Sequence, residues 1–242
     1  KTASDISACL VGSEMCIRDR YQTPHFNIHY DTDGSSGSVS SNDLNNNCVP
    51  DYVENMGLIF EDVYYFFKDS MGYDITFLNS QNVGNNKYDI FIDNLPTNYF
   101  AITYTTSFIN QASTSCGSYI KMRNNYNGAA FQNITELENI KITAAHEFFH
   151  AIQYSYKPNS NDSYFRELSS MWFENIFVPN CFDFLDFVDM SSNSLFNNPD
   201  RSFDYNTSGT YGYSLSLFAH YLSTIIDLDG SQSQLNSKII RN

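Results

Sequence analysis

A helix that has almost no polar face constrains the fold of this chain more than any other feature. In the segment 135–156, TELENIKITAAHEFFHAIQYSY, Thr135 and Glu138 have the spacing of a capping box, which predicts that the helix begins there. Pro158 predicts its end. Small, aliphatic and aromatic residues fill most positions of 140–152, so the rest of the protein must surround this part of the helix.

Three polar residues interrupt this apolar stretch: His146, Glu147 and His150. Residues four apart on a helix differ by about 40°, so both histidines lie on one face and can bind one metal ion. Glu147 lies about 100° from His146 and can reach a water molecule on that metal. In the H-E-x-x-H pattern, the histidines bind Zn²⁺ and the glutamate is the general base of a metalloprotease. Burying these groups without partners would cost several kcal/mol, a cost that coordination would offset.

A catalytic zinc takes three protein ligands and leaves a fourth position for water. A second helix is predicted to begin at Asp162 or Ser163 and to end before Pro179, and it contains Glu167 and Glu174. Seven residues separate these two glutamates, so they lie on one face of the helix. Either can supply the third ligand.

The other predicted elements give an α+β order, with strands first and helices later. Alternation and β-branched or aromatic residues predict strands at 25–31, 88–93, 100–106 and 118–123. Amphipathic patterns predict helices over about 50–70 and 212–226. Strand 118–123, just before the histidine-bearing helix, is predicted to lie at the edge of the sheet beside the cleft, where an extended peptide can pair with it.

The first twenty residues, KTASDISACLVGSEMCIRDR, differ in composition from the rest. The string LVGSEMCIRDR resembles one that recurs at the ends of metagenome-derived sequences, where adapter DNA has been translated with the gene. We therefore set residues 1–20 aside. The rest is predicted to form one catalytic domain, with a sheet-bearing part over 21–133 and a helical part over 134–242. We expect it to be truncated, because the ending NSKIIRN has no natural finish.

The net charge of −14, with no basic cluster, argues against nucleic acid or an anionic membrane surface as a partner. No segment approaches the roughly 18 consecutive apolar residues that a membrane span requires.

A second metal motif lies in the segment DLNNNCVPDYVE, 43–54, which nearly matches a calcium-binding loop. Cys48 stands where that motif has a glycine that favours positive φ. The alternative is an asparagine-rich turn that caps the helix after Pro50. The candidate calcium ligands are Asp43, Asn45, Asn47, Asp51 and Glu54.

The pair of segments TAAHEFFHAIQYSY and FRELSSMWFENIF resembles the gluzincin type of zinc metallopeptidase. More narrowly, it is similar to a family of uncharacterised bacterial metalloproteases, expected to be secreted, whose second motif reads approximately W-M-E-G-T-A-x-W-M-E-D. The resemblance implies that Glu167 is the third zinc ligand and that Glu174 is the second glutamate of that motif. Leu168, Ser170 and Asn175 stand where the family has Gly, Ala and Asp. The similarity extends to TPHFNIHYDTDG, NNNCVPDYVENMG and TYGYSLSLFAHYL, and so covers nearly all of the chain after residue 21.

This resemblance implies a zincin-like fold: a twisted mixed sheet with a backing helix, the HExxH helix and a helical C-terminal part. It also implies zinc-dependent hydrolysis of peptide bonds outside the cytoplasm. By its position in the late helix, Tyr211 or Tyr213 is a candidate donor to the oxyanion. The competing hypothesis is a secreted, calcium-stabilised binding or adhesion domain in which zinc is structural or absent. A third is hydrolysis of a non-peptide ester or amide by the same metal centre.

Overall fold

The computed structural model describes residues 19–75, 87–97, 99–108, 116–128, 133–157, 163–182, 184–189, 192–205 and 209–226. Its elements, in chain order, are β1 (Asp19–Gln22), β2 (Phe26–Tyr30), α1 (Asp51–Tyr65), β3 (Tyr88–Asp93), β4 (Ala101–Phe108), β5 (Cys116–Arg123), α2 (Glu136–Tyr156), α3 (Ser163–Phe177), α4 (Phe184–Asp189), α5 (Gly209–Ser214) and α6 (Ser216–Tyr221). The predicted α+β order is therefore confirmed.

The predicted helices differ from the observed ones mainly near their ends. The helix expected over 50–70 ends as α1 at Tyr65 and continues as a π-helical turn, Phe66–Ser70. The helix expected over 212–226 is divided at Leu215 into α5 and α6 and finishes in a second π-helical turn, Leu222–Ile226. Just before this division, the Ser214 hydroxyl donates a hydrogen bond to the Tyr211 carbonyl oxygen at 2.8 Å. Such a side-chain hydrogen bond competes with the backbone hydrogen bonds of the helix.

The sheet is mixed, with strand order β1-β2-β3-β5-β4. Strands β2, β3 and β5 are parallel, whereas β1 and β4 run antiparallel to their neighbours. Strand β1 begins two residues inside the segment that the sequence analysis set aside, with Asp19 opposite Tyr30. Residues 1–18 lie outside the described part of the chain.

The prediction that segment 118–123 forms the sheet edge is wrong. This segment belongs to β5, which lies between β3 and β4, and β4 ends the described sheet on that side. Strands β4 and β5 pair antiparallel, with Thr103 opposite Ile120. Either strand of such a pair can bond to the rest of the sheet, which leaves the other strand at the edge. The sequence spacing therefore does not decide which strand lies outside.

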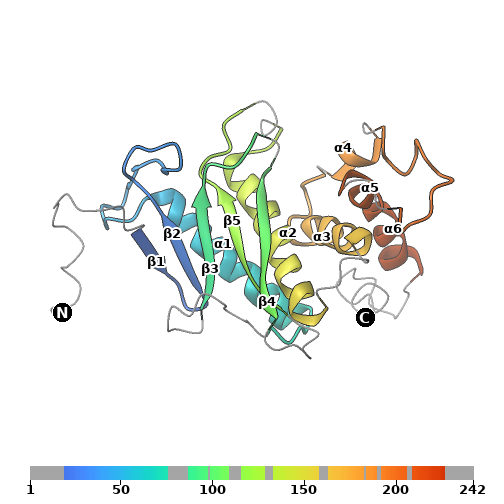
Figure 1. Ribbon diagram of the computed structural model, residues 1–242, viewed down its shortest axis with the longest axis horizontal. Coiled ribbons are helices and arrows are strands. Elements are labelled where there is room, and N and C mark those ends of the chain that lie inside the picture. Colours follow the sequence, from blue (N-terminus) through green and yellow to red (C-terminus); the bar gives the residue numbers. More distant parts are fainter. Residues whose placement is uncertain are drawn as a thin grey trace.

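Helices α1 and α2 cover one face of the sheet, and α3 to α6 gather beyond the β4 edge, as Figure 1 shows. Phe148 of α2 joins these layers because its ring contacts Phe26 of β2, Phe60 of α1 and Tyr88 of β3, with centroid separations of 5.4, 6.4 and 5.9 Å. Each fully buried aromatic side chain contributes about 1.5–3 kcal/mol to folding. This core fixes the rotation of α2 about its axis and so the direction in which its polar residues point.

In the described residues we find no helix whose length and apolar character would let it cross a membrane.

Candidate metal centre

The N-terminus of α2 begins where the sequence predicts. The Thr135 hydroxyl accepts a hydrogen bond from the Glu138 backbone N–H at 3.2 Å, and the Glu138 carboxylate accepts one from the Thr135 backbone N–H at 2.9 Å. Both halves of the capping box are thus present. From this fixed start the helix runs through His146, Glu147 and His150, all of which are buried.

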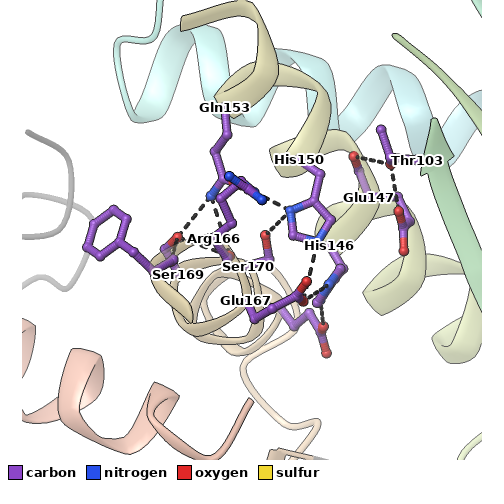
Figure 2. Close-up of polar contacts among 11 residues, drawn as sticks. Thr103, His146, Glu147, His150, Gln153, Arg166, Glu167, Ser169 and Ser170 are labelled. Atoms are coloured by element: carbon purple, nitrogen blue, oxygen red, sulfur yellow. Dashed lines mark hydrogen bonds and ion pairs between the residues drawn. The ribbon is translucent and has the colours of Figure 1, made fainter. Parts of the chain in front are cut away.

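The structure brings three of the predicted ligands together between α2 and α3 (Figure 2). Glu167 Oε2 lies 3.3 Å from His146 Nε2 and 3.4 Å from His150 Nε2. Among the described residues, these three side chains form the group whose spacing suits a metal ion, with their ligand atoms within 4.8 Å of one another. Two imidazole nitrogens and one carboxylate oxygen are ligands that zinc accepts.

The contacts of Glu167 Oε2 with the two histidines fit a shared ion better than they fit hydrogen bonds. This oxygen is buried and makes no hydrogen bond within the described residues, although it faces both Nε2 atoms. Ligands about 2.0–2.1 Å from a tetrahedral zinc stand about 3.3 Å from one another. The two distances therefore match two edges of a zinc tetrahedron.

The other nitrogen of each histidine ring is already occupied. His146 Nδ1 lies 2.5 Å from Glu174 Oε1. His150 Nδ1 lies 3.0 Å from Gln153 Oε1 and 3.2 Å from Ser170 Oγ. Such partners hold the proton on Nδ1 and leave Nε2 free for a metal.

These contacts distinguish the two glutamates, which helical spacing alone could not separate. Glu167 faces both Nε2 atoms, whereas Glu174 contacts the far side of His146 and is absent from the group of candidate ligands.

The structure also explains two of the positions at which this chain departs from the family that it resembles. Ser170 contacts His150, and the Asn175 amide donates to the Cys181 carbonyl oxygen at 2.8 Å.

The electrostatics of the centre reflect this close grouping of charges. Burial alone would lower the pKa of His146, but its contacts with Glu167 and Glu174 raise that pKa well above its usual value. Burial alone would raise the pKa of Glu167, but the neighbouring His150 and His146 hold it well below its usual range. The carboxylate is thus kept ionised, as a metal ligand must be, whereas the raised pKa favours a protonated His146, whose Nε2 gives up its proton when a metal binds.

Helix α5 approaches the centre through a glycine. A Cβ atom on Gly212 would stand 2.9 Å from Glu167 Cβ, so a larger residue there would displace the glutamate. The next residue, Tyr213, has its ring centroid 5.9 Å from that of His146. Burial, together with Glu167, Glu147 and Glu174, raises the pKa of Tyr213, which keeps its hydroxyl protonated as a donor.

Of the two candidate tyrosines, Tyr211 is directed elsewhere. Its ring is fully buried, and its hydroxyl donates to the Arg201 carbonyl oxygen at 3.2 Å. Of these two candidates, Tyr213 is therefore the one that lies beside the metal centre. The sequence could not distinguish them, because both belong to the same short helix.

The sequence analysis missed three side chains that support the centre: Thr103, Gln153 and Ser170. Gln153 follows His150 by three residues and Ser170 follows Glu167 by three, so helical spacing could have indicated both. Thr103 comes from β4, and its hydroxyl lies 2.6 Å from Glu147 Oε2. No spacing along the chain signals that contact.

The predicted calcium loop is exposed, and its oxygens bind the loop's own N–H groups. Asp43 accepts from the backbone N–H groups of Asn47 and Cys48 at 3.2 and 2.8 Å, while the side-chain amides of Asn45 and Asn47 donate to Glu54 at 2.8 and 2.5 Å. Asp51 instead accepts from Leu44 N–H and from the Asn42 amide. Among the described residues, the carboxylates of Asp43, Asp51 and Glu54 do not form a group close enough to hold a metal ion. Calcium binding stays a prediction.

Cys48 adopts the conformation that the calcium motif requires of its glycine. Its φ is +70°, and Asn46 also has a positive φ, of +58°. The loop thus makes the sharp turn of the motif although it lacks the glycine.

A polar cavity of about 580 Å³ lies where the first turns of α1 and α2 meet the loops around residues 38–42 and 124–127. Its lining includes Asp51 and Glu136 but none of the histidines or glutamates of the metal centre. The candidate chemistry therefore does not depend on this cavity.

Neither the models of known protein families nor the curated proteins with which this chain was compared include a match.

Proposed function

We propose that this protein is a zinc-dependent peptidase in which His146, His150 and Glu167 bind the metal and Glu147 is the general base. The observation that carries the proposal is the position of Glu167 Oε2, 3.3 and 3.4 Å from the two Nε2 atoms, while the Nδ1 atoms have other partners. Three ligands from the described residues suit a catalytic zinc, which keeps one position open, better than a structural zinc, which has four.

When bound, zinc would act as a Lewis acid on a carbonyl group and would lower the pKa of a water ligand. Glu147 takes a proton from the attacking water and delivers it to the leaving amine. Tyr213 donates a hydrogen bond to the oxygen on which negative charge develops, a role that its raised pKa supports. Glu174 and Gln153 hold the two imidazole rings in the orientation that exposes Nε2.

The substrate that we propose is a peptide in extended form that pairs with β4. This strand ends the described sheet, and its Thr103 contacts Glu147, so a peptide along β4 would lie beside the general base. The prediction of action outside the cytoplasm rests on the resemblance of the two helix motifs and is part of the same proposal.

The test measures zinc content and casein hydrolysis together, in the protein and in its Glu147→Gln variant. We expect one zinc per chain in both, with hydrolysis lost in the variant, because glutamine keeps the shape of the side chain but cannot take the proton. A folded protein without stoichiometric zinc would overturn the proposal. Zinc without hydrolysis in either form would favour the binding-domain hypothesis, and turnover of esters alone would favour the non-peptide one.

A further inference from the structure

The carboxylate of Glu147 is held from outside its own helix. The Thr103 hydroxyl of β4 lies 2.6 Å from Glu147 Oε2 and 3.0 Å from the Glu147 carbonyl oxygen. Figure 2 shows the Glu147 side chain directed toward β4, away from the pair of histidines that faces Glu167. A hydroxyl has one proton to donate, and the shorter contact, to a charged acceptor, is the stronger of the two.

Thr103 is suited to fix a flexible side chain. Glutamate has three rotatable side-chain bonds, whereas threonine is branched at Cβ and has a restricted χ1. The backbone of Thr103 is held in the sheet by its pairing with Ile120 of β5. A single hydrogen bond from this rigid position therefore removes most of the freedom of the Glu147 carboxylate.

The two oxygens of that carboxylate differ in their partners. Glu147 is buried, and Oε2 accepts from Thr103, whereas Oε1 makes no hydrogen bond to the described residues. Oε1 is not among the fully buried polar atoms of the described residues that lack a partner, so it keeps contact with solvent and can accept a hydrogen bond from an outside donor. In hydrolysis that donor is the attacking water.

We propose that Thr103 is a positioning residue for the general base: it holds Glu147 Oε2 and so presents Oε1 to the water that attacks the substrate. This inference rests on the proposed peptidase function and adds to it a residue from the edge strand. A misdirected base slows proton transfer while the metal ligands and the substrate-binding strand stay intact. The loss therefore falls on kcat rather than on KM or zinc content.

The test compares Thr103→Val, Thr103→Ser and, as a matched control, Thr32→Val. Thr32 is exposed and lies outside the strands and helices, away from the proposed substrate-binding strand. Valine keeps the branched shape of threonine without the hydroxyl, and serine keeps the hydroxyl. We expect Thr103→Val to lower kcat about 10- to 100-fold, with KM and zinc content within about two-fold of wild type. Thr103→Ser should stay within about three-fold of wild type, and Thr32→Val should match wild type.

Two results would overturn the inference: an unchanged kcat in Thr103→Val, or a loss in Thr103→Ser as large as that in Thr103→Val. A fall in kcat that follows zinc content or the melting temperature would also overturn it, since it would mean that Thr103 only ties β4 to α2. If Thr103→Val does not fold, the decision rests on Thr103→Ser and on Thr103→Ala. An inactive wild type, or a fully active Glu147→Gln variant, would instead refute the peptidase function itself.

Discussion

The α2–α3 metal centre and the loop 43–54 both carry metal motifs, but they are built in different ways. In the metal centre, the candidate ligands lie on two helices of at least 15 residues. Both histidines are buried and Glu167 is partly buried, and the second nitrogen of each histidine is bonded. In the loop, Asn45 and Asn47 are exposed, the three acidic ligands are partly buried, and most of the ligand oxygens accept hydrogen bonds from the loop itself. The ligands of the metal centre are therefore positioned by the packing of two helices, whereas those of the loop are positioned by hydrogen bonds within the loop.

This difference indicates what each region gains from an ion. The metal centre holds two buried histidines against a partly buried carboxylate, so an ion there would relieve the burial of polar groups that face one another. The loop already satisfies its carboxylates with N–H groups, so calcium must replace hydrogen bonds that exist without it. We therefore expect tight zinc binding and weaker calcium binding.

Loss of Glu167 should have the largest effect. Glu167→Ala removes the carboxylate that faces both Nε2 atoms, so zinc content should fall to background and hydrolysis by roughly 1,000-fold or more. Elemental analysis of the purified protein and a casein assay measure both. The matched control is Glu54→Gln in the loop, which should keep full zinc content and activity. Stoichiometric zinc in Glu167→Ala would show that another residue completes the site.

Loss of Glu174 should have a smaller effect on the same centre. Glu174→Gln keeps a hydrogen-bond acceptor for His146 Nδ1 but removes the charge, so zinc affinity should fall about 10- to 100-fold. Titration against a chelator of known affinity measures this change. If Glu174 rather than Glu167 were the third ligand, Glu174→Gln would lose zinc, whereas Glu167→Ala would lower zinc affinity only partly.

The sequence predicted much of this structure where regular spacing controls the geometry. The capping box at Thr135 and the common face of His146 and His150 follow from helical periodicity, whereas the choice of Glu167 as the third ligand came from the resemblance. The four predicted strands were found for a similar reason, because the alternation of β-branched and aromatic residues has a fixed period. Strand β1 was missed because its first two residues fell within the segment set aside.

The sequence did not predict contacts that depend on how elements lie against one another. Which of β4 and β5 ends the sheet depends on pairing rather than on spacing, and so does the contact between Thr103 and Glu147. The choice between Tyr211 and Tyr213 depends on the rotation of α5, which Gly212 brings against Glu167. These are packing outcomes that no local pattern encodes.

Calcium should stabilise the protein modestly if the loop binds it. At calcium concentrations ten times the dissociation constant, linkage gives about 1.4 kcal/mol, which for a domain of this size corresponds to a rise in Tm of about 3–6 °C. Thermal melts with calcium and with a chelator measure the shift, and Glu54→Gln should abolish it. The shift should persist in Glu167→Ala, which separates it from zinc. An unchanged Tm at millimolar calcium would contradict the prediction.

The smallest effect concerns the cysteine that stands where the calcium motif has glycine. Cys48 holds a φ of +70°, which costs a residue with a Cβ atom about 1 kcal/mol or more, whereas glycine accepts it freely. Glycine also gives the unfolded chain more entropy, which offsets part of the gain. We therefore expect Cys48→Gly to raise the free energy of unfolding by at most about 1 kcal/mol, as measured by denaturant titration.

Asn46→Gly is the control for Cys48→Gly, because asparagine tolerates a positive φ and its replacement should gain less. If the loop binds calcium through the turn that these residues form, Cys48→Gly should also strengthen the calcium-dependent rise in Tm, since the turn is then less strained before the ion arrives. Zinc content should not change. A loss of stability in Cys48→Gly would mean that contacts of the cysteine side chain outweigh the strain, and the loop would then be a structural turn rather than a weakened calcium site.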